Sequence, residues 1–518
     1  MTWQPEVDEL KRRLEFARQG GGEVGIARQR KRGKLTAPER LDALADEDSL
    51  RLFLSLVGRG EYDEDGSLTG FTPKPAITGF IKIDGRKVVV NASDFTVRGG
   101  AGGGREGGLG QEISDTERAY EWRVPYIRLL DAAGGSVGHF EQIGRTYLPD
   151  GNSFTQHDVR LLDTVPVVSA ALGSVAGLPA VYMPMSHFSV MVEGISQIFP
   201  GGPPVVKAAL GYDITKEDLG DERIHARISG VVDNLAKTED EAFEMIRQFL
   251  SYLPSNAYEM APRTEPTDDP ERRDEELLSI FSKKRRPYNA RKLIRHVVDE
   301  GSFFEIAPLY GKARVTGLAR FNGYPVGIMA NAPREAGGAT NVAAGEKVSR
   351  LMQLCDAFHL PLISLANEPG FMVGLNEEKR GIERAGARLV ATTIRSRMPW
   401  CTIAVGQLFG VAGQCQHRPT GMFRRYAWPS ATWGSMHIEG GTRAAYRREI
   451  ESAPDPAAKE AEIEQRLKRI ASPFRTAEAT GQDIIDPRDT RPLLCEFVED
   501  AQTILQTQLG PSPIPYMP

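Results

Sequence analysis

The chain has 518 residues, of which 41% are hydrophobic and 26% charged, and its formal net charge at pH 7 is −5. This length exceeds one ordinary hydrophobic core and predicts two domains of about 200–250 residues each. The composition is typical of a soluble globular protein, and the small net charge argues against nucleic acid as the main partner.

Membrane, secretion and metal signals are absent from the sequence pattern. No run of 18 apolar residues occurs, and the amino terminus, MTWQPEVDELKRRLEF, is charged and helical in pattern. The four cysteines form no C-x-x-C pair and the eight histidines show no metal-ligand spacing. We therefore expect a cytoplasmic protein in a reducing compartment, with no disulfide framework and no metal.

A basic run is the first feature along the chain with possible chemistry. It includes Arg28, Arg32 and Lys34, which could meet phosphate groups. A solvated helix face is the simpler interpretation of such a run.

The most informative feature is an internal repeat. Residues 77–92, ITGFIKIDGRKVVVNA, resemble residues 315–330, VTGLARFNGYPVGIMA, which lie 238 positions later. Both segments predict a β-hairpin with its turn at Asp84-Gly85 or Asn322-Gly323.

Three more matched pairs occur in the same order. VPYIRLLDAAGG (124–135) matches LPLISLANEPGF (360–371), and VPVVSAALGSVAG (165–177) matches MPWCTIAVGQLFG (398–410). A lead-in, ERLDALADEDSLRLF (39–53), resembles KLIRHVVDEGSFFEI (292–306). The offsets of 233–253 residues indicate a duplicated domain. Strands that feed helices within each half predict an α/β fold.

Each repeated strand ends in small residues. They are Gly134, Gly135 and Gly177 in the first half, and Gly370 and then Gly410, Val411 and Ala412 in the second. Accessible backbone N–H groups at such junctions can form an oxyanion hole. The alternative is that the glycines only permit tight turns and close packing.

The Gly-rich segment 99–110, GGAGGGREGGLG, contains a G-x-G-x-x-G pattern at 102–107, with Asp131 further on. A dinucleotide site is one interpretation. Eight glycines in twelve residues make the pattern nearly unavoidable, however, and the segment follows a hairpin. A mobile loop bordering a site, beginning at Gly99 and Gly100, is the favoured interpretation.

The chain also carries ordered segments that resemble the acyl-CoA carboxyltransferase family, the β subunits of biotin-dependent propionyl-CoA, methylcrotonyl-CoA and acetyl-CoA type carboxylases. Among them are GKLTAPERLDALAD, PPVVKAALGYDITKEDLG, LCDAFHLPLISLANEPGFMVG, YAWPSA and ASPFRTAEATGQDIIDPRDTR. The resemblance runs over nearly the whole chain.

This resemblance implies two tandem crotonase-like domains of the ClpP/crotonase β-β-α spiral type. We expect an acyl-CoA domain at 1–261, a polar linker at 262–290 and a biotin domain at 291–518. It further implies a hexamer, possibly mixed with a paralogous β subunit, and an active site between two subunits. Because no Met-Lys-Met site or ATP-grasp region is recognised, biotin would arrive as carboxybiotin on a separate carrier, served by a separate biotin carboxylase.

Roles are carried over from the family by position. The thioester oxyanion hole would use Gly134 and Gly135, and the biotin-side hole Val411 and Ala412. Other residues would contact the substrates, and the expected set is Gly99, Gly100, Gly177, Gly370, Phe371, Gly410 and Gln414. Arg28, Arg32 and Lys34 would contact CoA phosphates.

Two runs depart from the family pattern. Residues 131–138 read DAAGGSVG where the family has DSGGARIQ, and residues 410–414 read GVAGQ where it has GGAYD. Gln414 falls at the position that shapes the acyl pocket and suggests an acyl group other than propionyl. The alternatives are a decarboxylase of malonyl-type thioesters with the same fold, or a weakly active scaffold subunit beside an active paralogue.

Overall fold

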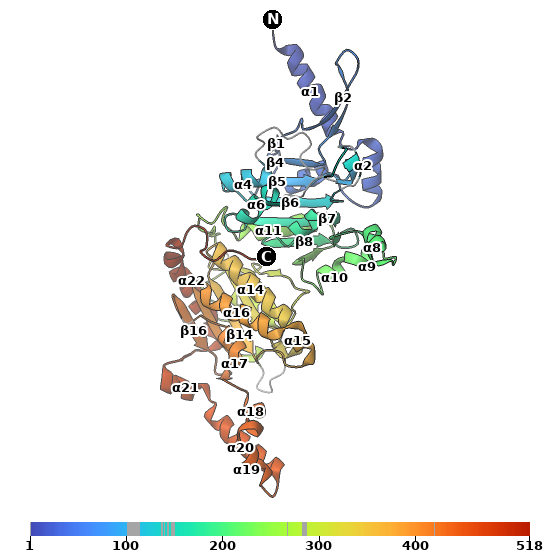
Figure 1. The fold of residues 1–518 in the computed structure, drawn as a ribbon. Coiled ribbons are helices and arrows are strands. Elements are labelled where there is room, and N and C mark those ends of the chain that lie inside the picture. The colour runs from blue at the N-terminus through green and yellow to red at the C-terminus, as the bar shows by residue number, and fades with distance from the viewer. Residues whose placement is uncertain are drawn as a thin grey trace. The chain divides into compact units, whose positions relative to one another are not determined.

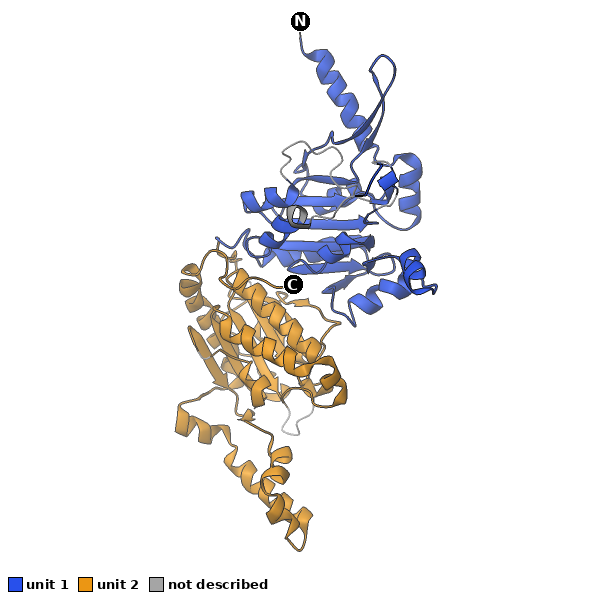
Figure 2. Ribbon diagram, viewed as in Figure 1, with its two compact units in different colours: residues 1–258, 518 blue, residues 259–517 orange. Residues whose placement is uncertain are grey.

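The structure is a computed structural model that describes residues 2–100, 114–135, 138, 140–141, 144–146, 151–266, 268–281, 287–418 and 420–518, with the side chains of 151–154 excepted. It divides into two compact units, residues 1–258 with 518 and residues 259–517 (Figure 2). The predicted domain boundaries and the division of labour between the domains stay predictions.

Unit 1 is built on one sheet with the strand order β1-β4-β5-β6-β7-β8-β10, and β9 also pairs with β7 (Figure 1). Its strands are β1 (Arg51–Phe53), β4 (Ala76–Ile83), β5 (Arg86–Ser93), β6 (Tyr126–Ala132), β7 (Val167–Ala176), β8 (Phe188–Val192), β9 (Gln197–Phe199) and β10 (Asn234–Ala236). Strands β2 (Gly58–Tyr62) and β3 (Leu68–Pro73) form a separate hairpin. The pairs β1–β4 and β4–β5 are antiparallel, and the others in the large sheet are parallel.

Unit 2 repeats this order as β11-β12-β13-β14-β15-β16-β18, with β17 also paired to β15. Its strands are β11 (Phe304–Ile306), β12 (Arg314–Phe321), β13 (Tyr324–Asn331), β14 (Leu362–Glu368), β15 (Trp400–Phe409), β16 (Phe423–Ala427), β17 (Thr432–Gly434) and β18 (Asp483–Ile484). The predicted α/β fold with an internal duplication is confirmed.

Helices connect and flank the strands of both sheets. In unit 1 they are α1 (Gln4–Arg18), α2 (Gly22–Lys31), α3 (Ala37–Leu44), α4 (Asp115–Trp122), α6 (Gly151–Leu161), α7 (Leu178–Tyr182), α8 (Pro203–Leu210), α9 (Lys216–Gly220), α10 (Glu222–His225) and α11 (Glu239–Ser251). In unit 2 they are α12 (Leu277–Ile280), α13 (Ala290–Val297), α14 (Val342–Ala357), α15 (Leu375–Arg380), α16 (Ile382–Arg395), α17 (Gly410–Gln414), α18 (Ile438–Ala445), α19 (Arg447–Glu451), α20 (Pro456–Ile470), α21 (Pro473–Thr480) and α22 (Thr490–Gln506).

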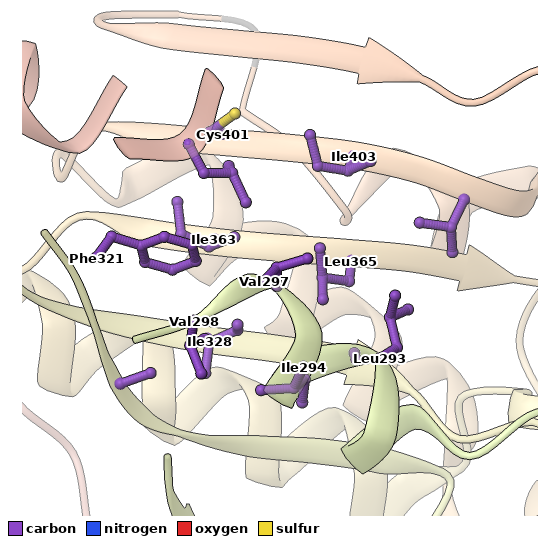
Figure 3. Close-up of a cluster of buried hydrophobic side chains, with 14 of the residues drawn as sticks. Leu293, Ile294, Val297, Val298, Phe321, Ile328, Ile363, Leu365, Cys401 and Ile403 are labelled. Carbon is purple, nitrogen blue, oxygen red and sulfur yellow. The ribbon is translucent and has the colours of Figure 1, made fainter. Parts of the chain in front are cut away.

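The core of unit 2 follows from helical periodicity. Helix α13 buries residues 290, 293, 294 and 297, which share one face because they are spaced by three and four. Figure 3 shows this face packed toward apolar side chains of β14 and β15, including Ile363, Leu365 and Ile403. The lead-in segment of the repeat is therefore a core helix.

The segment 262–290, expected to be a linker, belongs to unit 2. Leu277 and Tyr288 are buried in the same cluster as α13. Leu278, beside Leu277, is 50% exposed, so only some of the apolar residues of this segment join the core.

Both predicted hairpin turns are confirmed. Asp84 and Asn322 each have φ of 50°, and Gly85 and Gly323 each have φ of 79°. Two consecutive positive φ values define the turn type that suits a two-residue hairpin, and Asp-Gly and Asn-Gly adopt it readily.

A carboxylate clips each hairpin turn in the same way. Asp46 accepts hydrogen bonds from the amides of Asp84 and Gly85, at 3.0 and 2.8 Å. Asp299 accepts them from the amides of residues 322 and 323, at 3.1 and 2.8 Å. An arginine pairs with each carboxylate, Arg247 in unit 1 and Arg491 in unit 2. The duplication therefore extends to side-chain contacts.

The strands that carry the repeated turns also share an irregularity. The β6–β7 register skips between Leu130 and Ala132, and the β14–β15 register skips between Ala366 and Glu368. Such bulges re-aim the strand end and end regular pairing. In each unit the bulge directly precedes the glycine turn.

Candidate active site

The glycine turns of unit 1 lie against one another. Gly134 follows β6 with φ of 79°, and a Cβ atom there would lie 2.7 Å from the carbonyl oxygen of Ala176, at the end of β7. A Cβ atom on Gly177 would lie 3.5 Å from the Cα atom of Gly134. Only glycine at 134 allows this approach, so the two turns form one small-residue site.

Two backbone donors are available at this site. Within the described residues, no acceptor is found for the amides of Gly134 and Gly135. The amide of Gly177 is different, because it donates to the carbonyl oxygens of Phe199 and Pro200, both at 3.2 Å. Gly177 is therefore a turn residue that adjoins the donors and is not a free donor itself.

The start of the Gly-rich segment borders the same site. The carbonyl oxygen of Gly99 accepts the amide of Ala133 at 3.0 Å. A Cβ atom on Gly100 would lie 2.5 Å from the carbonyl oxygen of Asp131. Gly99 and Gly100 therefore lie beside the turn, and their role in binding substrate stays a prediction; residues 101–110, including the G-x-G-x-x-G pattern, lie outside the described residues.

Unit 2 repeats the arrangement. Gly370 has φ of 130°, and a Cβ atom there would lie 4.0 Å from the carbonyl oxygen of Phe409, the residue before Gly410. Helix α17 begins at Gly410, and no acceptor is found among the described residues for the amides of Val411 and Ala412 in its first turn. These amides carry the partial positive charge of a helix amino terminus.

In the loop that follows β14, residues 369–372, some backbone amides have acceptors and one does not. Gly370 donates its amide to Glu368 Oε1 at 3.0 Å, so it is not a free donor. The amide of Met372 donates to the carbonyl oxygen of Thr340 at 2.9 Å. Of the described amides between Glu368 and Met372 outside the strand, only that of Phe371 has no acceptor, and its ring packs against Gly386 of α16.

Gln414 is the last residue of α17, and its side chain is exposed. Val411 is also exposed, with 48% of its surface accessible. A Cβ atom on Gly413 would lie 2.9 Å from the carbonyl carbon of Leu408, so a glycine here permits α17 to pack closely on β15. Residues 411 and 414 therefore border the donors with their side chains.

The basic run divides into exposed and buried members. Arg28 and Arg32 are exposed at the carboxyl-terminal end of α2. Lys34 is buried, and its ammonium group lies 2.7 and 3.0 Å from the carboxylate oxygens of Asp131. Burial lowers the pKa of Lys34, and Asp131 opposes that shift. A phosphate contact by Lys34 would require this ion pair to break.

Asp131 is the centre of a buried ionic cluster that sequence reasoning missed. Its carboxylate is fully buried and also contacts Gln29 Nε2 at 2.8 Å and Arg40 at 3.3 Å. Arg40 in turn pairs with Glu239 at 2.6 Å. Because the carboxylate of Asp131 is buried and already bound by these side chains, it is not accessible to the ribose of a dinucleotide. The repeated ERLDAL segment, which contains Arg40, was the one available signal.

His437 is a second residue that the sequence did not single out. Its ring stacks on Phe409 with centroids 4.0 Å apart, and Nε2 lies 2.5 Å from the carbonyl oxygen of Pro369. It therefore joins the end of β15 to the facing loop. No spacing in the sequence connects His437 with position 369, so only the fold reveals this contact.

The described residues offer neither a metal site nor a membrane-spanning helix. No group of three or more His, Cys, Asp or Glu side chains there could hold a metal ion. No helix in that part of the chain has the length and apolarity needed to cross a membrane.

Comparisons with known proteins identify relatives over nearly the full length. Residues 28–506 match the carboxyl transferase domain family. The carboxyltransferase subunit of propionyl-CoA carboxylase from Haloferax mediterranei is 36% identical over 501 residues, which are 95% of each chain. The alpha subunit of methylmalonyl-CoA decarboxylase from Veillonella parvula is 32% identical over 503 residues, covering 95% of this chain and 94% of the relative.

A solved structure agrees with these relatives. Transcarboxylase 12S, described as a hexamer with methylmalonyl-coenzyme A and methylmalonic acid bound, superimposes with a TM-score of 0.86 at 29% identity. The match covers 97% of this chain and 96% of that one.

Proposed function

This chain belongs to the carboxyl transferase domain family and is an acyl-CoA carboxyltransferase, and we propose that it moves CO2 from carboxybiotin to an acyl-CoA through an enolate held by backbone amides. The observation that carries the proposal is the pair of donor sites, Gly134 with Gly135 and Val411 with Ala412. The first site follows β6 and the second follows β15, which is the unit 2 counterpart of β7, and neither has an acceptor among the described residues. Preorganised amides of this kind stabilise developing negative charge.

On the acyl-CoA side, Gly134 and Gly135 would donate to the thioester oxygen as it gains enolate charge. The groups against Gly134 are backbone atoms of Ala176 and Gly177, and the nearby carboxylate of Asp131 is committed to Lys34 and Arg40. This arrangement supports catalysis by positioning and charge stabilisation, without a titrating side chain of this chain as the base. Arg28 and Arg32 remain candidates for the CoA phosphates.

On the biotin side, the free amides fit a neutral ureido oxygen. Val411, Ala412 and Phe371 offer N–H donors, and no cationic side chain is needed to hold an uncharged ring. When bound, carboxybiotin supplies CO2, and its ureido nitrogen accepts the α-proton of the acyl-CoA. The donors of this chain would hold the ureido oxygen as it gains charge.

The partners follow from the same proposal. Biotin would be carried by a separate carrier protein and recharged by a separate biotin carboxylase, in a cytoplasmic complex. We propose a hexamer of this chain, or one mixed with a paralogous β subunit, on the precedent of the transcarboxylase 12S hexamer.

The substrate proposal depends on Gln414. Its exposed neutral amide at the end of α17 supports an acyl group that is bulkier or more polar than propionyl. A second candidate function is decarboxylation of a malonyl-type thioester, which the methylmalonyl-CoA decarboxylase relative favours. Both reactions require the same enolate stabilisation.

The deciding experiment uses the chain purified with its native partners. 14C-bicarbonate fixation with ATP is measured across a panel of acyl-CoAs, and loss of CO2 is measured from methylmalonyl-CoA and malonyl-CoA. Incorporation into any thioester supports the carboxylase. CO2 release without incorporation supports the decarboxylase, and neither activity in an intact biotinylated complex contradicts both.

The acyl-side hole has a matched pair of variants. Gly135→Pro removes one donor, whereas Gly135→Ala keeps it, and a Cβ atom at 135 meets no described atom within 4 Å. We expect Gly135→Pro to lower kcat about 100-fold or more and Gly135→Ala to stay close to wild type. Unchanged turnover in a folded Gly135→Pro protein would refute this assignment.

A further inference from the structure

A buried carboxylate lies directly behind the biotin-side turn. Glu368 is the last residue of β14, and its side chain is 0% exposed. Oε2 accepts hydrogen bonds from four side chains, namely Thr340 Oγ1 at 2.6 Å, Arg314 Nη2 at 2.7 Å, Asn331 Nδ2 at 3.1 Å and Gln416 Nε2 at 3.2 Å. Oε1 accepts the amide of Gly370 at 3.0 Å.

The Gly370 contact holds the facing loop. Besides its bond to Glu368, the loop is held by Thr340, whose amide donates to the carbonyl oxygen of Gly370 at 3.1 Å. Thr340 also accepts the amide of Met372 at its own carbonyl and donates its hydroxyl to Glu368. Every described backbone donor around Phe371 is thereby restrained, and the amide of Phe371 is left free.

The hydrogen bond between Gln416 and Glu368 connects the carboxylate to the end of α17. Gln416 follows α17 by two residues, and its amide donates to the carbonyl oxygen of Gly413 at 3.2 Å. Its side-chain oxygen accepts from Arg314 and Ser364, and its side-chain nitrogen donates to Glu368. One carboxylate therefore joins the loop at 370–371 to the helix that carries Val411 and Ala412.

Charge pairing makes this junction stiff. Arg314 is 1% exposed and pairs with Glu368 at 2.7 Å. Burial lowers the pKa of Arg314, and Glu368 opposes that shift. Because a buried charge without its partner is strongly unfavourable, the carboxylate cannot swing away from this position. Arg314 binds Oε2 of Glu368, whereas Gly370 binds Oε1, so the hydrogen bond to Gly370 is separate from the ion pair.

We propose that Glu368 is a positioning residue for the biotin-side half of the reaction, because its carboxylate sets the loop at Gly370–Phe371 against the first turn of α17. The identity of the ligand as biotin rests on the proposed function. The connection that Glu368 makes between the loop at Gly370–Phe371 and α17 is independent of the proposed function.

A matched control separates positioning from plain stability. Glu368→Gln keeps an acceptor near Gly370 but removes the charge that holds the network. Asp299→Asn removes another buried carboxylate of unit 2 that pairs with a buried arginine, Arg491, at 2.7 Å. Asp299 holds the hairpin turn at 322–323, so both variants lose a buried ion pair but only one is tied to the site.

The first readout is amide hydrogen exchange on the full chain. We expect Glu368→Gln to raise exchange about tenfold in peptides that cover 369–374 and 410–416, whereas Asp299→Asn raises it around 321–325 only. Equal exchange at 369–374 and 410–416 in the two variants would overturn the proposal.

The second readout uses biocytin as the carboxyl acceptor from the carboxylated form of the acyl-CoA that incorporates most 14C in the substrate panel. We expect Glu368→Gln to raise the KM for biocytin about tenfold while the KM for that carboxylated acyl-CoA stays unchanged, and Asp299→Asn to change neither. If both constants change together in Glu368→Gln, the role is only structural and the proposal fails.

Two further outcomes are distinguishable. If Glu368→Gln does not fold, Glu368→Asp keeps the charge against Arg314 with a shorter side chain and is expected to give the same pattern. If the wild-type complex transfers no carboxyl group, the proposed function fails, while the exchange experiment still decides whether Glu368 couples the two segments.

Discussion

The ends of β6 and β14 are equivalent in the duplicated fold, yet they place their buried charge differently. In unit 1 the charge is on Asp131, whose partners Lys34 and Arg40 come from outside the sheet. In unit 2 the equivalent residue is the neutral Asn367, and the charge lies on the next residue, Glu368. The buried carboxylate therefore lies one position later along the strand in unit 2 than in unit 1.

Asn367 lies against a glycine of the next strand in the same way as Asp131 does. A Cβ atom on Gly173 would lie 2.1 Å from Asp131 Oδ1, and one on Gly406 would lie 2.2 Å from Asn367 Oδ1. Duplication therefore preserved the shape of the bulge, and the ionic cluster diverged around it. In unit 1 the cluster ties the amino-terminal segment to the sheet, whereas in unit 2 it ties the loop to α17.

The largest effect is expected where the cluster of unit 1 is broken. Arg40→Ala leaves two buried carboxylates, Asp131 and Glu239, without their guanidinium partner. We expect the free energy of unfolding to fall by about 3–5 kcal/mol in a denaturant titration. Arg30→Ala, which breaks an exposed pair with Glu39, should cost less than about 1 kcal/mol. Equal losses in the two variants would contradict a dominant buried cluster.

The ion pairs at the two hairpin turns, Asp46–Arg247 and Asp299–Arg491, allow a second comparison of the two units. The side chains of Asp299 and Arg491 are 7% and 1% exposed, whereas those of Asp46 and Arg247 are 30% and 27% exposed. Desolvation strengthens the penalty for an unpaired charge, so Asp299→Ala should cost about 3 kcal/mol and Asp46→Ala about 1 kcal/mol. Thermal and denaturant unfolding of both variants measure this ratio, and a larger loss in Asp46→Ala would reverse the argument.

Alanine at the two bulge glycines probes the conserved shape. Gly173→Ala and Gly406→Ala each force a methyl group against a buried oxygen, and about 1–3 kcal/mol of destabilisation is expected. Gly173→Ala should cost more, because the ion pairs hold Asp131 in place. Gly345→Ala in α14, where the nearest atom would lie 3.8 Å away, should be neutral or slightly stabilising in the same thermal assay. Tolerance of Gly173→Ala would disprove the close approach.

The smallest expected difference between the units is the loss of folding stability at acidic pH that one partly buried histidine in each unit causes. Burial and Arg425 lower the pKa of His417 in unit 2 from 6.5 to about 4. In unit 1, burial lowers the pKa of His225, but the carbonyl oxygen of Ile198 opposes the shift. A lowered folded-state pKa contributes stability that is present above pH 6.5 and is lost as the pH falls toward 4.

We therefore expect His417→Gln to reduce the loss of stability between pH 7 and pH 4.5 by about 1–2 kcal/mol, and His225→Gln to reduce it by less. Unfolding titrations at several pH values measure the slope. A steeper acid loss in His417→Gln than in wild type would show the opposite sign and refute the assignment.

Local chemistry made much of the fold predictable. The two hairpin turns follow from Asp-Gly and Asn-Gly, because adjacent residues determine that backbone conformation. The repeated apolar strands identified β6, β7, β14 and β15, and the small residues after them located the turns where free amides are found. The α/β fold and the duplication could be recognised in this way, whereas the family was recognised from the resemblance of ordered segments such as YAWPSA to the family's sequences.

Long-range pairing was not predictable from the sequence. The sequence predicts a solvated or phosphate-binding side chain at Lys34, but the fold brings it to Asp131, which is 97 residues away. Gly370 was expected among the site residues, yet its amide is committed to Glu368 and leaves Phe371 as the free donor.

Sequence alone therefore determined the repeat and the turns, because backbone conformation and strand periodicity depend on neighbouring residues. Only the tertiary structure decided which buried charges pair, because Arg314 and Gln416 reach Glu368 across 54 and 48 residues of chain once the strands are assembled. The cost of burying an unpaired charge then fixes these contacts, which connect Gly370 and Gln416 through one carboxylate.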